Sequence, residues 1–77
     1  MNIEELEGLS WITVDSSNLD AVAMGEDIMY IRFNGGRIYA YTNISPTVYA
    51  DLISADSVGR YFNANIKGHY EYEEIEA

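Results

Sequence analysis

The stretch that decides the fold is residues 36–70, which read GRIYAYTNISPTVYADLISADSVGRYFNANIKGHY. Its first residues alternate in the manner of a strand. Ser45-Pro46 then predicts the start of a helix, with serine as the N-cap and proline at the first helical position. The buried stripe of this helix is expected to comprise Val48, Tyr49, Leu52 and Ile53.

A second helix is predicted in the same stretch. It begins near Asp56 or Ser57 and runs to about Lys67, because apolar residues recur there every four positions: Val58, Phe62 and Ile66. Gly68 is expected to stop this helix, since glycine readily adopts the left-handed conformation found just after helix ends.

Upstream of the helices, residues 28–33 and 37–41 predict a hairpin. The Asn34-Gly35 pair favours a two-residue type I′ turn. That register pairs Arg32 with Arg37, Tyr30 with Tyr39 and Ile28 with Tyr41, and it leaves an apolar opposite face of Met29, Ile31, Phe33, Ile38 and Ala40. A three-residue loop would shift the pairing by one residue and exchange the faces. We favour the shorter loop because it separates an apolar face from an aromatic and cationic one.

Further strands are predicted at residues 9–15, 19–24 and 69–72, with a turn at residues 16–18. The expected fold is α+β: a small twisted antiparallel sheet in the order β-β-β-β-α-α-β, with two short helices packed on one face. Residues 9–72 form a single domain in this interpretation. Residues 1–8 are an acidic, frayed arm, and residues 73–77 are a mobile acidic tail.

Composition restricts the function further. The chain has 77 residues, no cysteine and a net charge of -9, with only four lysines and arginines against thirteen carboxylates. The absence of cysteine excludes a disulfide framework and the usual zinc fingers. An acidic N-terminus without a long apolar run predicts a cytoplasmic protein. Such a negative chain is expected to repel long polyanions, but not a small anion held by local arginines.

Several short motifs and single residues follow one another at a characteristic spacing: Tyr39-Ala40-Tyr41, Val48-Tyr49, Leu52, Ala55, Ser57, Gly59, and Tyr61-Phe62-Asn63 followed by Ile66. With residues 16–18 and 33–35, these motifs resemble the KTSC domain over about residues 16–70. The resemblance implies a small module that occurs alone in bacterial and phage-type proteins and at the C-terminus of some lysyl-tRNA synthetases. It also implies RNA binding as an expectation.

The predicted Arg32-Arg37 pair is the first candidate ligand site. Like charges directly opposite on a sheet are destabilising, and an anion would resolve the conflict because guanidinium groups grip phosphate bidentately. Tyr39 and Tyr41, together with Tyr30, would offer a stacking surface for a base. The alternative is that each arginine pairs with a carboxylate, such as Glu71 or Glu73.

The start of the second helix is the other candidate site. A helix N-terminus presents free N–H groups; Ser57 adds a hydroxyl, Gly59 permits close approach and Arg60 adds charge. Asn63, one turn further on, could hydrogen-bond a ligand. The alternative is an ordinary cap, with Gly59 required for close packing and Asn63 as a structural amide.

Catalysis is not expected. His69 is the only histidine, and no cysteine or serine nucleophile elbow accompanies it. The glutamates of residues 71–76 lack the glycine-centred geometry of a calcium loop, so no metal or cofactor is predicted.

The leading hypothesis is a non-catalytic module that binds, and sequesters, a phosphate-bearing small ligand of the nucleotide class. A phage-encoded antagonist of host defence signalling, acting in the host cytoplasm, would be a natural setting. The alternatives are an RNA-binding accessory domain, as the family resemblance implies, and an acidic protein-interaction module. The small core and the surplus of aromatic residues also predict a homo-oligomer.

Overall fold

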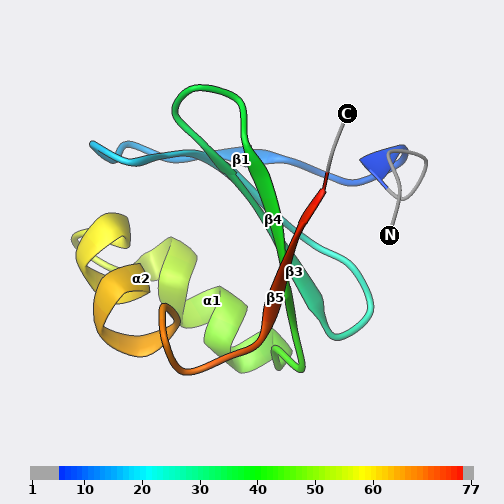
Figure 1. Ribbon diagram of the computed structural model, residues 1–77. Coiled ribbons are helices and arrows are strands. Elements are labelled where there is room, and N and C mark those ends of the chain that lie inside the picture. The colour runs from blue at the N-terminus through cyan, green and yellow to red at the C-terminus, as the bar shows by residue number, and fades with distance from the viewer. Residues whose placement is uncertain (1–5, 76–77) are drawn as a thin grey trace.

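The computed structural model describes residues 6–75 and shows a five-stranded antiparallel sheet with two helices against one face (Figure 1). The strands are arranged across the sheet in the same order as in the sequence. Both helices come from the segment of the chain that connects the fourth strand to the fifth. The elements are β1 (Ile12–Thr13), β2 (Leu19–Met24), β3 (Ile28–Phe33), β4 (Ile38–Thr42), α1 (Pro46–Ser54), α2 (Val58–Asn65) and β5 (Tyr72–Ile75). The α+β prediction is therefore confirmed.

Both helices begin where their caps predict. The Ser45 hydroxyl accepts a hydrogen bond from the Val48 N–H at 3.3 Å, and Pro46 opens α1. In α2 the Ser57 hydroxyl accepts from the Arg60 N–H at 3.2 Å. Each hydroxyl satisfies a backbone donor that the first helical turn leaves without an intrahelical partner.

The helices pack against one face of the sheet, which we call the helix-side face (Figure 1). Ile53, expected in the buried stripe of α1, is instead 37% exposed. The core on this face is formed by buried side chains from β2, β3, β4, both helices and the residues after β4 and α2: Leu19, Val22, Met29, Ile31, Tyr41, Ile44, Leu52, Val58, Phe62 and Ile66. Every fourth residue of α2 enters this core, as the sequence predicts. Gly68 follows α2 with a φ of 82°, the left-handed conformation expected after a helix end.

The predicted hairpin register is wrong by one residue. Tyr30 pairs with Ala40, Ile31 with Tyr39, and Arg32 with Ile38. The loop therefore contains three residues, 34–36, in which Gly35 and Gly36 have φ angles of 101° and 95°. Because side chains alternate along a strand, the shift moves Arg32 and Arg37 to opposite faces of the sheet.

The reason lies on the other side of the sheet, which we call the outer face. A second apolar cluster forms there around Ala23, Tyr30, Ala40 and Ile75. The partly buried side chains of Leu6, Leu9 and Trp11 pack against it. Both faces therefore bury apolar residues, and a segregation of polar from apolar side chains was the wrong criterion for the register. The predicted frayed arm is also corrected in its described part, since Leu6 packs on the sheet.

The ends of the sheet differ from the prediction as well. The strand expected at residues 9–15 shrinks to β1, and the last strand lies at Tyr72–Ile75 rather than at residues 69–72. Residues 73–75, predicted as part of a mobile tail, pair with β4, and Ile75 is buried opposite Ile38. One apolar residue among glutamates anchors this strand. Residues 1–5 and 76–77, the rest of the predicted arm and tail, lie outside the described residues.

Candidate functional site

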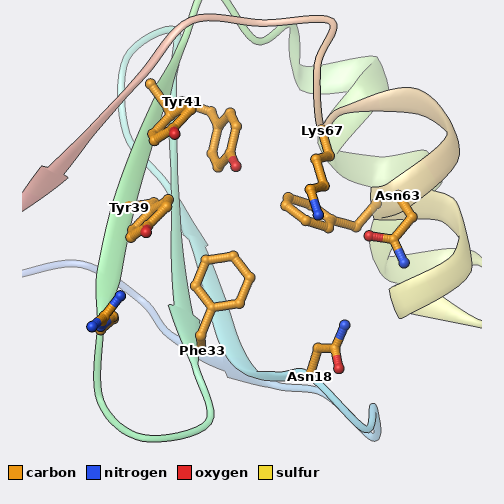
Figure 2. Close-up of a pocket in the computed structure, with 9 residues that line it drawn as sticks. Asn18, Phe33, Tyr39, Tyr41, Asn63 and Lys67 are labelled. Atoms are coloured by element: carbon orange, nitrogen blue, oxygen red, sulfur yellow. The ribbon is translucent and has the colours of Figure 1, made fainter.

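A hollow of about 380 Å³ lies on the helix-side face, between the sheet and α2, as Figure 2 shows. We call it the aromatic hollow. It is lined by Asn18, Phe33, Arg37, Tyr39, Tyr41, Phe62, Asn63, Lys67 and Tyr72. The volume is within the range of pockets that hold small organic ligands.

Aromatic rings form the wall of the hollow. Tyr39 and Tyr72 stack almost in parallel, with ring centroids 5.0 Å apart and an interplanar angle of 3°. They can do so because β4 and β5 are neighbours and both side chains rise from the helix-side face. Phe33 meets Tyr39 edge to face at 5.1 Å, and Phe62 of α2 meets Phe33 in the same way at 5.6 Å. Tyr72 remains 57% exposed, so an aromatic surface stays open to solvent.

Polar side chains surround this wall. Arg37, which follows the hairpin loop, and Lys67, which follows α2, are exposed cations that line the hollow. Asn18 and Asn63 approach from the turn before β2 and from α2 (Figure 2). Within residues 6–75, none of these four side chains has a hydrogen bond or ion pair with the protein. Their donors and acceptors are available to a ligand.

Tyr41 lies at the deeper end of the hollow and is only 3% exposed. Burial raises the pKa of Tyr41 to about 12, with smaller contributions from the neighbouring Tyr72 and Tyr39 hydroxyls. The neutral phenol is therefore strongly favoured at physiological pH. Tyr41 can donate a hydrogen bond or pack against a ring, but it is not an anionic base.

Arg32 does not belong to this site. It lies on the outer face, where its Nε donates to an Asp20 carboxylate oxygen at 2.8 Å. Its guanidinium also lies 5.1 Å from the centre of the Trp11 ring. The prediction that Arg32 faces Arg37 is wrong. The carboxylate alternative holds for Arg32, although the partner is Asp20 and not a glutamate of the last strand.

The residues predicted at the start of α2 line a second hollow of about 440 Å³, which contains Ser57, Gly59, Arg60 and Asn63. Asp15 and Asp56 line it too, and their carboxylates oppose an anion there. A Cβ on Gly59 would lie 2.9 Å from the Ser16 hydroxyl oxygen, so close packing alone explains this glycine. Asn63 lines both hollows. The geometry thus joins Arg37, Tyr39, Tyr41 and Asn63 in one site and places Ser57, Gly59 and Arg60 beside it.

Sequence reasoning missed five lining residues: Asn18, Phe33, Phe62, Lys67 and Tyr72. Lys67 could have been found, because it follows Asn63 by four residues and so lies near the same helix face. Tyr72 and Phe33 depended on the correct strand registers.

His69 is exposed in the turn after α2, so the strand that would have aligned it with Glu71 is not formed there. No group of three or more histidine, aspartate or glutamate side chains within residues 6–75 could hold a metal ion. In the same range, neither helix is long and apolar enough to cross a membrane.

The sequence model of the KTSC domain matches residues 15–70, which include the turn before β2, the hairpin and both helices. The chain belongs to the KTSC domain family. The crystal structure of a KTSC domain protein from Yersinia pestis superposes with a TM-score of 0.81 at 26% identity, and the match covers 90% of this chain and 100% of that one. The fold described above is therefore that of a solved KTSC domain.

Curated relatives are of two kinds. A protein of Tsukamurella paurometabola is 37% identical over 59 residues, which cover 74% of this chain and 88% of that protein. A lysine–tRNA ligase of Nostoc punctiforme is 40% identical over 45 residues, which cover 58% of this chain but 8% of the ligase. The KTSC domain thus occurs as a separate small protein and as a small part of a much longer enzyme.

Proposed function

We propose that this KTSC domain binds a small phosphate-bearing aromatic ligand of the nucleotide class in the aromatic hollow. One observation carries the proposal: two cations and two amides whose side chains have no protein partner within the described part of the chain border a wall of tyrosine and phenylalanine rings. Rings attract a flat heterocycle, and cations attract a phosphate.

Stacking supplies the first part of the binding energy. The parallel Tyr39-Tyr72 pair presents a ring face beside the hollow, and Tyr72 is largely exposed. A nucleobase that extends this stack would gain about 1–3 kcal/mol. The amides of Asn18 and Asn63 could then hydrogen-bond the edge of the base, since an amide offers both donors and an acceptor.

Local charge supplies the second part. The chain as a whole carries -9, yet Arg37 and Lys67 are the charged side chains that line this hollow. Opposite charges at contact distance are screened little, whereas charges farther away than about 8–10 Å are screened by salt. The hollow can thus accept one or two phosphates on a protein that repels a long polyanion.

The proposed activity is binding without turnover. The hollow contains no histidine, carboxylate or cysteine among its lining residues, so it lacks a general base and a nucleophile of the usual kinds. A protein that binds a nucleotide in this way would sequester it. Sequestration of a host signal by a phage-encoded protein remains our prediction for its setting.

Isothermal titration calorimetry with the four ribonucleoside monophosphates, their nucleosides and inorganic phosphate tests the proposal. We expect a monophosphate to bind more tightly than its nucleoside and than phosphate alone. Arg37→Ala and Lys67→Ala should each weaken binding about tenfold or more, because a charge-assisted hydrogen bond contributes roughly 1.5–3 kcal/mol.

Arg32→Ala is the matched control, because it removes the same charge from the other face of the sheet. It should leave the affinity within about twofold. Equal losses in all three arginine and lysine variants would indicate a general charge effect and contradict a defined site. A processed nucleotide after incubation would contradict binding without turnover.

RNA binding is the second candidate, and the match to lysine–tRNA ligases favours it. Titration of fluorescent oligouridylate at low and moderate salt distinguishes the two. Tight binding to the oligonucleotide with a steep salt dependence, and none to monophosphates, would favour RNA, since each phosphate contact releases counterions. The net charge of -9 predicts the opposite result.

A further inference from the structure

The two edges of the sheet differ in charge. β5 forms one edge, and exposed glutamates lie within it and directly before it: Glu71, Glu73 and Glu74. β1 forms the other edge, and residues 9–14 there, LSWITV, contain no charged residue and no proline. Charges and prolines are the usual means by which proteins prevent an edge strand from pairing with another chain. The β5 edge is protected in this way, whereas within residues 6–75 the β1 edge is protected only by its shortness.

The free backbone groups of β1 can be identified from its pairing with β2. The Val14 N–H donates to the Asp20 carbonyl at 3.1 Å, and Ile12 lies opposite Val22. Since N–H and C=O groups alternate in direction along a strand, those of Trp11 and Thr13 point away from β2. The Ile12 side chain lies on the helix-side face and is 40% exposed, which is unusual for a large aliphatic residue in so small a protein.

We infer that the β1 edge is where two copies of this chain associate. The partner is a second copy because the edge is neutral on a body of charge -9. Two such bodies repel each other wherever their carboxylates meet, and they can approach at this uncharged edge. Paired β5 edges would instead bring glutamates of both copies together. The interface is self-complementary, as a two-fold axis requires.

The register follows from the directions of the free groups. An antiparallel pair centred on Ile12 lets Trp11 of one copy exchange backbone hydrogen bonds with Thr13 of the second copy. Ile12 then lies opposite its own equivalent in a position without hydrogen bonds, where Cα atoms are about 4.5 Å apart and side chains are in close contact. The two sheets become one continuous sheet with β5 at both ends. The inference does not depend on the proposed ligand.

Sedimentation velocity over a range of protein concentrations tests this interface. The wild-type mass should rise with concentration from the monomer value of 8.7 kDa to twice that value. Thr13→Pro removes an outward N–H that the monomer does not use, and it should restore the monomer. Glu74→Pro is the matched control at the other edge, where pairing of Thr42 with Glu71 and of Ala40 with Glu73 leaves the Glu74 N–H pointing outward. It should leave the dimer intact.

A cross-linking experiment covers the case in which Thr13→Pro does not fold. The chain has no cysteine, so Ile12→Cys introduces a single thiol. Cα atoms in the proposed register lie within the 4.4–6.8 Å that a disulfide requires. Mild oxidation should therefore convert Ile12→Cys to a covalent dimer. Ile53→Cys, at a position of similar exposure on α1, should stay monomeric.

The inference is supported if Ile12→Cys cross-links selectively and the wild type dimerises. It is overturned if the wild type keeps a mass of 8.7 kDa at hundreds of micromolar, or if Ile12→Cys and Ile53→Cys cross-link equally slowly. A dimer that Glu74→Pro dissociates would place the interface at the β5 edge and overturn it as well.

Discussion

Arg32 and Arg37 lie five residues apart on one hairpin, yet they occupy different chemical environments. Arg32, on the outer face, is held by Asp20 at 2.8 Å and covers the Trp11 ring. The Arg37 side chain, directly after the loop, has no hydrogen bond or ion pair within residues 6–75 and lines the aromatic hollow. The first arginine is part of the structure, whereas the second is available to a ligand.

The difference arises from a single loop residue. With two residues in the loop, both arginines would share a face; with three, they are separated by the sheet. A cluster of charge that sequence reasoning placed in one pocket is thus divided between a structural role and a candidate binding role.

Tyr41→Ala is the most severe test of this comparison. The observed register buries Tyr41 in the core at 3% exposure, whereas a two-residue loop would place it on the same face as Arg32. We expect the loss of more than about 3 kcal/mol of unfolding free energy, because a large buried aromatic side chain is removed and leaves a cavity. Urea denaturation followed by circular dichroism measures it. Gly35→Ala is the milder control, with a cost of about 1 kcal/mol for its positive φ. Wild-type stability of Tyr41→Ala would contradict the register that buries this ring.

Truncation of the ring that joins the sheet to α2 is expected to have the next largest effect. Phe62 is 3% exposed and contacts Phe33 and Tyr41 edge to face. Phe62→Ala should cost about 3–5 kcal/mol through lost burial and the cavity that remains. Thermal unfolding of Phe62→Leu, which keeps most of the volume, provides the comparison. A loss below about 1 kcal/mol in Phe62→Ala would show that α2 contributes little to the core.

Titration at high pH tests the environment of the deep end of the hollow. Since burial raises the pKa of Tyr41 to about 12 from 10.0, the folded state retains this proton longer than the unfolded state does. The resulting stability is fully present below pH 10 and is lost as the pH rises toward 12. We expect Tyr41 to account for about 1–2 kcal/mol of that loss. Urea unfolding from pH 8 to 12 should show a shallower decline in Tyr41→Phe than in the wild type. Parallel pH profiles would contradict the burial of this hydroxyl.

The smallest expected effects concern the two arginines. Arg32→Ala should lower the unfolding free energy by about 1 kcal/mol, because it removes a partly exposed ion pair and a contact with the Trp11 ring. Arg37→Ala should change it by less than about 0.5 kcal/mol, as for most surface substitutions. Chemical denaturation of both variants at moderate salt tests the difference. Equal losses would remove the distinction between a structural and an available arginine.

Local signals in the sequence predicted the parts of the fold that short-range chemistry controls. Ser45-Pro46 and Ser57 fixed the helix starts, and the spacing of Val58 and Phe62 fixed the buried side of α2. The hairpin register failed because it depends on what covers the outer face, and residues 6–11 do so from far along the chain. The prediction of the last strand's position was wrong for a similar reason, because the burial of Ile75 depends on the pairing of this strand with β4.

The candidate site was predicted in part for the same reasons. Arg37, Tyr39, Tyr41 and Asn63 do converge, because adjacent strand positions and one helix face bring them together. Arg32 was assigned to the wrong face through the register. Tyr72 required the position of β5, which no motif in the sequence specifies.

Because Tyr72 lies on β5, the aromatic hollow is complete only while β5 is paired with β4. Strands β1 to β4 follow one another through short connections, whereas β5 joins β4 only after 29 intervening residues have formed both helices. Contacts between distant parts of a chain form late, and an edge strand opens more easily than a central one. Half of the stacked tyrosine pair therefore sits on an edge strand that is held at the end of the longest connection in the sheet, so we expect a brief detachment of this strand to release a bound ligand while the rest of the domain stays folded.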